Sequence, residues 1–355
     1  MAPPLHPSRP RPAAPAAACP RCVAMLAMLL LAVGGCRGGG GDTYHPVFPP
    51  APAEARLIHR ANVQTAADLS RPTLLDDLAG LIAGRSHPKL GRPSAIAHDG
   101  GRHLFIADMR RQAVHVFDTR RGRSRLIERA GEEHLVSPVG LAVLDDGHLA
   151  VADSALGSVF IFDARRRLVK TIAEPQRPTG MHYVAEDGEL YITDTLAHRV
   201  LIYDRRLELS RTIGEPGHGP GQLNFPTHVF VDADRRVYVT DAMNFRVQVF
   251  DAGGRYLTHI GEHGDATGHL AVPKGVAVDS HGHIYIVDAY FSAVQVFDRR
   301  GRFLLAFGKP GDESGQFQLP NDLAMDGDDR LYIADTFNRR IQIFQYIGGP
   351  GDDLE

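Results

Sequence analysis

One spacing recurs six times along this chain of 355 residues. An Asp is followed nine residues later by an aromatic residue that closes a short β-branched run: Asp108 to Phe117, Asp153 to Phe162, Asp194 to Tyr203, Asp241 to Phe250, Asp288 to Phe297 and Asp335 to Phe344. Successive Asp residues are 41 to 47 positions apart, and a Pro precedes each by 15 or 16. Periods of this length are typical of propeller blades and of helical solenoids.

The composition of the repeat favours blades over solenoid helices. Each unit consists of short runs of Val, Ile, Tyr and Phe separated by Asp/Gly turns, without apolar residues at helical spacing. In the last units the pattern predicts strands over 320–325, 330–334 and 340–344, and a fourth type of strand over 303–307. Pro320 suits only the first position of its strand. Six such four-stranded units predict an all-β fold, a six-bladed β-propeller.

The last unit ends near Gly348 without a fourth strand, which would leave an unpaired edge. The segment 78–84 precedes Pro93 as the segment 304–308 precedes Pro320. We therefore expect a strand at about 78–84 to pair with the final strand and close the ring. The expected propeller domain is 75–348, preceded by an N-terminal extension over 56–74 and followed by a tail over 349–355.

Two stretches resemble the NHL repeat: 226–251, and 331–344 with its Asn338 and Arg340. The resemblance covers about 75–348 and is strongest in the fourth and sixth units. The Arg of the motif is present as Arg199, Arg246 and Arg340, whereas Ala113, Ser158 and Ala293 replace it in the other units. This resemblance implies a six-bladed propeller used mostly for binding, and it implies no single activity.

The start of the chain has the pattern of an export signal. Arg9, Arg11 and Arg21 precede an apolar run over 23–33, which is too short to span a bilayer. We expect a signal peptide over 1–35 and a Gly/Pro-rich linker over 36–55. The run 33–36, Val-Gly-Gly-Cys, resembles the lipobox of bacterial lipoproteins, which implies lipidation of Cys36 and a place in the periplasm or at the outer membrane. Simple secretion and an uncleaved anchor remain alternatives.

Cysteine spacing and charge give little information about the partners of this protein. Cys19 and Cys22 have redox or zinc spacing but lie inside the expected signal without further ligands, so we interpret the spacing as chance. The net charge of −3 says little about partners by itself, but an RNA-binding propeller would need a basic face, and we expect no nucleic-acid partner. Arg residues gather in the turns between third and fourth strands, at the same rim as acidic first turns. That pattern predicts a solvated rim of mixed charge, with anionic lipid headgroups or surface glycans as alternative contacts.

A propeller usually binds at the face where its inner strands begin, around the central channel. The two residues after each repeated Pro are mostly small or neutral, except for His228, Lys274, Asn321 and Asp322. We expect these four, from three successive blades, to form a binding site at the channel mouth. Local structural roles are the alternative for each of them: a carbonyl cap, a snorkelling Lys and a side-chain turn. The six repeated Asp residues are interpreted as turn residues that accept backbone N–H groups rather than as catalysts.

Two enzyme classes on similar propellers offer competing hypotheses. Amidating lyases that resemble NHL proteins hold zinc with three His, and this mouth supplies only His228. Lactonases of the gluconolactonase and regucalcin class bind a divalent cation through Glu, Asn and Asp, and the run 320–324 is similar to their Asn-containing segment. No Glu stands at the other five mouths, so carboxylate ligands are too few. We therefore predict no catalytic residues, no metal and no cofactor.

Aromatic residues suggest a second contact surface. The loops after the last three repeated Asp residues carry Phe245, Tyr290, Phe291 and Phe337, which can anchor a partner or fill space between blades. The sequence as a whole predicts an exported, lipid-anchored, monomeric propeller. It would act as a non-catalytic scaffold for a protein or an extracellular polymer. A metal-dependent hydrolase or lyase that uses the channel mouth is the alternative.

Overall fold

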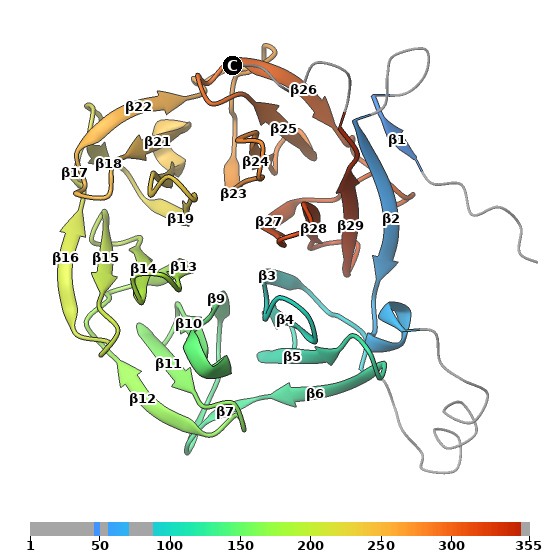
Figure 1. Ribbon diagram of the computed structural model, residues 1–355, viewed down its shortest axis with the longest axis vertical. Helices are drawn as coiled ribbons and strands as arrows, with labels where there is room; N and C mark the ends of the chain where they lie inside the picture. The colour runs from blue at the N-terminus through green and yellow to red at the C-terminus, as the bar shows by residue number, and fades with distance from the viewer. Residues whose placement is uncertain (1–45, 50–55, 71–87, 349–355) are drawn as a thin grey trace, which may run out of the picture. The chain divides into compact units, whose positions relative to one another are not determined.

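The computed structural model describes residues 46–49, 56–70 and 88–348, all within one compact unit. Six antiparallel sheets surround a central channel, one after another in chain order (Figure 1). Only short 3₁₀ helices occur among the described residues: η1 (Ala66–Leu69), η2 (Asp145–Gly147) and η3 (Ala242–Asn244). The predicted all-β, six-bladed propeller is confirmed.

Each blade has four strands that follow one another from the channel outward. Blade 1 contains β3 (Pro93–His98), β4 (His103–Asp108), β5 (Ala113–Asp118) and β6 (Arg123–Ile127), and blade 2 contains β9 (Pro138–Val143), β10 (Leu149–Asp153), β11 (Ser158–Phe162) and β12 (Leu168–Ile172). Blade 3 contains β13 (Pro178–Val184), β14 (Glu189–Asp194), β15 (Arg199–Tyr203) and β16 (Leu209–Ile213), and blade 4 contains β19 (Pro226–Val231), β20 (Val237–Asp241), β21 (Arg246–Phe250) and β22 (Tyr256–Ile260).

Blade 5 contains β23 (Pro273–Val278), β24 (Ile284–Asp288), β25 (Ala293–Phe297) and β26 (Phe303–Phe307), and blade 6 takes β27 (Pro320–Met325), β28 (Arg330–Asp335) and β29 (Arg340–Tyr346) from its own repeat. Two short strand pairs lie in the connections between blades: β7 (Arg129–Ala130) with β8 (Glu133–His134), and β17 (Glu215–Pro216) with β18 (Gln222–Leu223).

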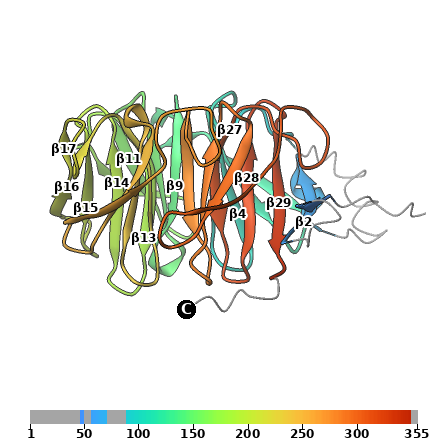
Figure 2. The same ribbon diagram turned by 90° about the horizontal axis from the view of Figure 1, so that it is seen from above.

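The repeated Pro and Asp residues mark the same end of every blade. In each inner pair of strands the first Pro lies opposite the blade Asp, as Pro226 lies opposite Asp241. Because the strands are antiparallel, the loops after the Asp residues and the entries to the inner strands share this end. We call it the mouth face, and Figure 2 shows the strands running from it to the opposite face.

Packing between neighbouring blades holds the ring together. Six clusters of buried apolar side chains each join residues of two adjacent blades, as Phe105 of blade 1 and Phe160 of blade 2 do. Full burial of such a side chain contributes about 1.5–3 kcal/mol. The clusters include the junction of blade 6 with blade 1, so the ring is closed by packing as well as by hydrogen bonds.

An N-terminal strand completes blade 6, as expected, but its position differs from the prediction. The strand β2 (Leu57–Val63) pairs with β29, and β1 (Val47–Phe48) adds a short outer strand. Leu57 and Val63 are buried, and Phe48 packs against Phe307 and Phe344. The closing strand is therefore Leu57–Val63, within the segment assigned to the extension; residues 78–84 lie outside the described residues.

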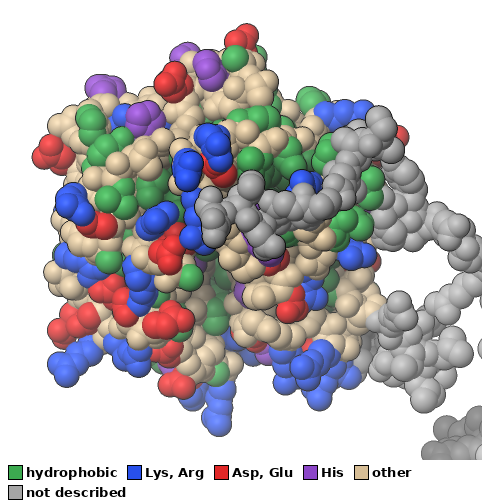
Figure 3. Space-filling model, turned by 45° about the horizontal axis from the view of Figure 1, so that its top comes forward, with side chains coloured by type: hydrophobic (Ala, Val, Ile, Leu, Met, Phe, Trp, Pro, Cys, Tyr) green, Lys and Arg blue, Asp and Glu red, His purple; other side chains and the backbone are tan. Residues whose placement is uncertain are grey.

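The rim of the opposite face carries charges of both signs. Ion pairs join neighbouring blades there, including Arg205 with Asp145 at 3.8 Å and Arg299 with Asp234 at 3.3 Å. In Figure 3 many Lys and Arg side chains lie beside Asp and Glu side chains on the surface in view. This arrangement matches the mixed-charge rim that the sequence predicts.

Candidate functional site

The six repeated Asp residues are structural, as predicted. Each side chain is fully buried and accepts a hydrogen bond from a backbone N–H that lies 16 to 18 residues earlier, in the entry to its blade. The Asp241 carboxylate, for example, accepts the N–H of Asn224 at 2.6 Å. Each Asp therefore ties the loop that enters a blade to the end of its second strand.

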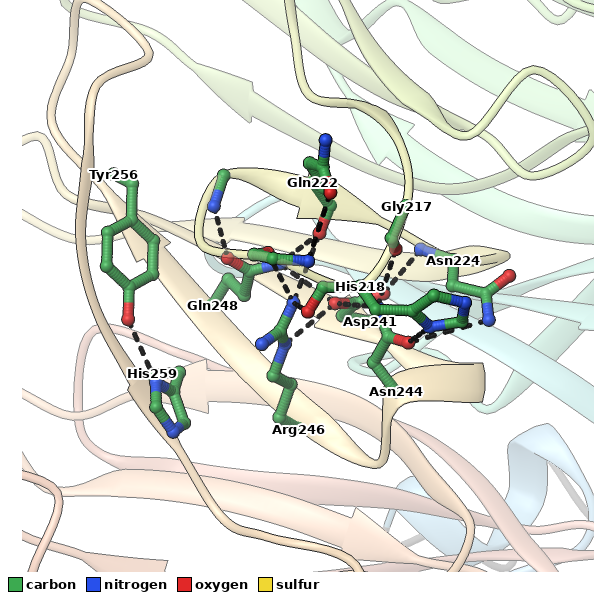
Figure 4. Close-up of polar contacts among 12 residues, drawn as sticks. Gly217, His218, Gln222, Asn224, Asp241, Asn244, Arg246, Gln248, Tyr256 and His259 are labelled. Carbon is green, nitrogen blue, oxygen red and sulfur yellow. Dashed lines mark hydrogen bonds and ion pairs between the residues drawn. The ribbon is translucent and has the colours of Figure 1, made fainter.

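Blades 4 and 6 extend this contact into the same polar cluster, which we call the clamp. In blade 4 the Oδ2 atom of Asp241 accepts hydrogen bonds from Asn244, Arg246 and Gln248 (Figure 4). Arg246 and Gln248 also donate to the carbonyl of Gln222, in the entry loop. Blade 6 repeats these contacts with Asp335, Asn338, Arg340, Gln342 and Gln316. The residues that carry the NHL resemblance thus hold entry loops in place.

The mouth of the channel is a cavity of about 450 Å³, which we call the mouth pocket. Three of the four predicted binding residues line it: His228 of β19, Lys274 of β23 and Asn321 of β27. The amide nitrogen of Asn321 donates to the carbonyl of Ser94 at 2.7 Å, which leaves its amide oxygen directed at no protein donor among the described residues. The structure therefore brings these three residues together.

Asp322, the fourth predicted residue, lines the channel below the mouth. There it shares a cavity of about 230 Å³ with His228, whose Nε2 atom lies 3.8 Å from Asp322 Oδ1. Asp322 Oδ2 accepts the backbone N–H of Ile96 at 3.0 Å, across the junction with blade 1. His228 is therefore the residue common to the mouth pocket and the channel cavity.

Glycines on the neighbouring blades allow the inner strands to approach closely at these two residues. A Cβ on Gly180 would lie 2.6 Å from the Cα of His228, and a Cβ on Gly275 would lie 2.9 Å from the Cα of Asp322. A side chain at either glycine would clash with the backbone of the next inner strand. The small residues read from the sequence therefore permit close packing of neighbouring inner strands around the channel.

Burial favours the neutral forms of the channel residues. It raises the pKa of Asp322 to about 7, against the hydrogen bond from Ile96. Burial, with a smaller effect of the Lys274 charge, lowers the pKa of His228 to about 3. Burial also lowers the pKa of Lys274, and the charge of Arg177 adds to this effect. At neutral pH His228 is therefore uncharged, and Asp322 lies near its titration midpoint.

The predicted rim aromatics do not form one surface. Phe245 lines the mouth pocket and packs against His263, with ring centroids 4.0 Å apart. Tyr290 is 68% exposed and contacts Phe291 edge to face. Phe337 lies under the guanidinium of Arg92, in a separate hollow of about 930 Å³ whose lining carries charges of both signs. Only Phe245 joins the polar residues of the mouth.

Sequence reasoning missed three polar residues near the channel. Arg177 stands just before Pro178 and lines the mouth pocket, and His98 and His182 line the channel cavity farther from the mouth. Burial lowers the pKa of His182 to about 4, with a smaller contribution from His98. The sequence analysis considered only the two residues after each Pro; the residue before it and those four or five after it would have revealed all three.

The residues of the mouth do not fit a divalent metal ion. Within the described ranges, no three His, Cys, Asp or Glu side chains lie close enough together to hold one. One oxygen of Asp322 already accepts a backbone N–H. The metal-binding side chain that lies near Asp322 is His228, at 3.8 Å. Ca²⁺ takes six to eight oxygen ligands, so the cation implied by the resemblance to lactonases lacks its carboxylates here.

Comparison with known families gives a clear assignment. A model described as the SMP-30/gluconolactonase/LRE-like region matches residues 93–312, which is more than half of the chain. The chain belongs to this family. No curated protein matches it significantly. Membership of the SMP-30/gluconolactonase/LRE-like family agrees with the six-bladed fold.

Several solved structures share the fold of this SMP-30/gluconolactonase/LRE-like chain. An auxiliary nutrient binding protein from Bacteroides thetaiotaomicron VPI-5482 is 14% identical with a TM-score of 0.59, covering 81% of this chain and 77% of that one. Virginiamycin B lyase from Staphylococcus aureus is 14% identical with a TM-score of 0.53, covering 72% and 95%. At these identities the likeness shows a common fold. No helix in the described part of the chain is long and apolar enough to cross a membrane.

Proposed function

We propose that this protein is a non-catalytic binding propeller, in which the mouth pocket captures a polar ligand. The observation that carries the proposal is the convergence of His228, Lys274 and Asn321, from three blades, in one cavity of about 450 Å³. Ligand sites combine concave shape, apolar walls and a few convergent polar groups. Phe225, Met243, Phe245 and Val272 supply apolar wall in this pocket.

The chemistry available in the pocket supports binding rather than turnover. His228 is neutral, and its partner Asp322 accepts a backbone hydrogen bond, so neither is placed to activate the hydroxyl or thiol of a nucleophile. The auxiliary nutrient binding protein with the same fold is named for binding, which agrees with this role. The ligand we propose is a small molecule or one end of an extracellular polymer or protein.

Export and anchoring belong to the same proposal. The apolar run over 23–33 and the following Cys36 support a lipid-anchored protein of the periplasm or the outer membrane. These residues lie outside the described ranges. Replacing Cys36 with Ser is expected to release the mature protein from the membrane fraction. Unchanged fractionation, with no lipid label on the wild type, would contradict the anchor.

Binding can be tested with the full chain in detergent. A thermal-shift screen of sugars, organic acids and amino acids, followed by calorimetry, should find ligands for the wild type. The variant His228→Ala/Asp322→Ala should remain folded and bind them at least tenfold more weakly, because polar contacts at the mouth are lost. The matched control is Tyr290→Ala/Phe291→Ala, at the rim. If only the rim variant loses binding, the mouth is structural.

Metal-dependent hydrolysis is the competing function, favoured by the family to which the chain belongs. A metal analysis of the purified protein after dialysis, together with a lactone hydrolysis assay, separates the two. Our proposal predicts no stoichiometric divalent cation and no turnover above background. A retained cation with turnover that depends on Asp322 would overturn it.

A further inference from the structure

The charges around the mouth pocket are of one sign. Among the described residues its lining contains two basic side chains, Arg177 and Lys274, and no Asp or Glu. The remaining polar lining residues are Ser137, Ser154, Thr179, Thr195, Thr227, His228 and Asn321, all of which are neutral at pH 7. A pocket with two cations and no carboxylate has a positive potential that nothing in its own wall cancels.

Lys274 is held in this pocket without a counter-ion. Its backbone is fixed in β23, where the Thr240 hydroxyl of blade 4 donates to its carbonyl at 2.7 Å. Among the described residues, no hydrogen bond or ion pair joins its ammonium to a protein acceptor. Lys274 is half-buried and its ammonium keeps contact with solvent, so a ligand that enters the pocket can reach it.

Arg177 brings a second charge of the same sign to the pocket. It stands at the entry to β13, where its backbone N–H donates to Asp194, the repeated Asp of blade 3, so the position of its Cα is fixed. Its guanidinium has no partner among the described residues. Arg177 lies close enough to Lys274 to disfavour the charged form of that amine. Arg177 is exposed and Lys274 half-buried, so solvent screens part of their repulsion, and an anion between them would reduce it further.

The geometry points to an oxyanion as the ligand group recognised here: we propose that the mouth pocket binds the carboxylate or phosphate of its ligand between Lys274 and Arg177. This inference rests on the proposed binding function and specifies its ligand class. The amide oxygen of Asn321 can accept a hydroxyl of the same ligand, and Phe245 and Met243 line an apolar wall for its uncharged body. Charge-assisted hydrogen bonds to two cations supply the specificity for an anion over its neutral analogue.

The chain permits a direct test, since it contains only four lysines: Lys89, Lys170, Lys274 and Lys309. Reductive methylation with ¹³C-formaldehyde retains their charge and gives one NMR signal for each, and loss of a signal in Lys274→Gln assigns Lys274. The probes are acetate, inorganic phosphate and, as the neutral match for acetate, acetamide, at constant ionic strength. An anion bound near the amine should raise the pKa of Lys274 by about 1 unit or more.

We expect acetate or phosphate to shift the Lys274 signal at concentrations at least tenfold below those that affect the exposed Lys309. Acetamide should have no such effect. Arg177→Gln should weaken the anion response at least fivefold, whereas Lys309→Gln should not change it. A response to acetate alone identifies a carboxylate ligand, and a response to phosphate alone identifies a phosphate ligand.

Equal responses of Lys274 to acetate and acetamide, or equal responses of Lys274 and Lys309 to the anions, would overturn the inference. Neither outcome by itself refutes the proposed binding function. If a neutral sugar binds in the calorimetric screen and depends on His228 while anions have no effect on Lys274, the binding function stands and the anion assignment fails. If no ligand of any charge binds, the binding function fails.

Discussion

The carboxyl groups of Asp108 and Asp322 have different surroundings: Asp108 is fully buried at the end of β4, whereas Asp322 lines the central channel with a small exposed area. Asp108 accepts hydrogen bonds from four backbone N–H groups and lies 3.3 Å from His115. Burial opposes its ionisation, yet these hydrogen bonds outweigh burial and lower its pKa to about 2. For Asp322 burial outweighs the backbone hydrogen bonds from Ile96 and Leu323 and raises its pKa to about 7.

The difference follows from repetition. Asp108 occupies a position that recurs in every blade, where the backbone itself supplies donors to the carboxylate. Asp322 occupies a position filled by Ala or Gly in blades 1, 2, 3 and 5. At the repeated position the entry loop of each blade supplies backbone donors to the carboxylate, whereas no other blade places a carboxyl group at the position of Asp322. The two positions therefore differ in what the repeated backbone provides to a carboxyl group.

The largest effect is expected where the repeated Asp holds a buried cation. Asp335→Ala leaves Arg340, which is 6% exposed, without its carboxylate, and Gln318, Asn338 and Gln342 lose an acceptor. Loss of one partner of a buried ion pair typically lowers the free energy of unfolding by about 3–5 kcal/mol. Urea denaturation measures the change. The solvent-exposed Asp328→Ala is the control, and a loss below about 1 kcal/mol for Asp335→Ala would contradict the structural role.

Replacing Asp322 with Asn should change how the free energy of unfolding depends on pH. Because the folded-state pKa of Asp322 exceeds its unfolded value, folded protein holds the proton between about pH 4 and 7. Wild-type stability should therefore fall relative to Asp322→Asn as the pH rises through this window, by an amount on the order of 3 kcal/mol. Denaturation at pH 4.5 and pH 8 gives the difference between the two proteins. A difference that does not change with pH would show that Asp322 is ionised in the fold.

A smaller loss of stability is expected for Gly180, which packs against the backbone of His228. Gly180→Ala places a methyl group against the backbone of β19, and overpacking of this kind costs about 1–3 kcal/mol. The free energy of unfolding should fall by that amount. The double variant Gly180→Ala/His228→Ala should recover little of it, because the nearest contacts are backbone atoms. Full recovery would mean that the His228 side chain, rather than the strand, occupies the space.

The smallest effect is expected at the exposed rim. Asp298 accepts the backbone N–H groups of Arg300 and Arg302 in the turn after β25, and the Arg302 side chain that pairs with it is 66% exposed. Exposed ion pairs contribute about 0.2–1 kcal/mol. Arg302→Ala should therefore change the free energy of unfolding by less than 1 kcal/mol at physiological salt. A larger loss would show that Asp298, at the opposite face, also contributes substantially to stability.

Repetition also explains what the sequence could predict. The period, the Pro-to-Asp spacing and the aromatic at the end of the third strand determine the blades, so the four strands of each unit were predictable. The closing strand was not, because Leu57–Val63 joins the ring through a connection whose length no repeat constrains. The predicted position assumed that the last link has the same length as the others.

The mouth was predictable in part for the same reason. His228, Lys274, Asn321 and Asp322 stand out because equivalent blades carry small residues there. Arg177 did not stand out, since polar residues precede Pro in several blades, among them Arg92, Ser137 and Arg177 itself. The direction of its side chain and the absence of a counter-ion are properties of the fold that spacing alone does not contain.

The pairing of β2 with β29 has a consequence for how the protein is made. Leu57 is among the first of the described residues to be synthesised, but its partner Tyr346 is among the last. The edge of β2 that pairs with β29 cannot be covered before the end of the propeller has been made, and contacts of such high sequence separation slow folding. The ring can therefore be closed only after nearly the whole propeller has been synthesised.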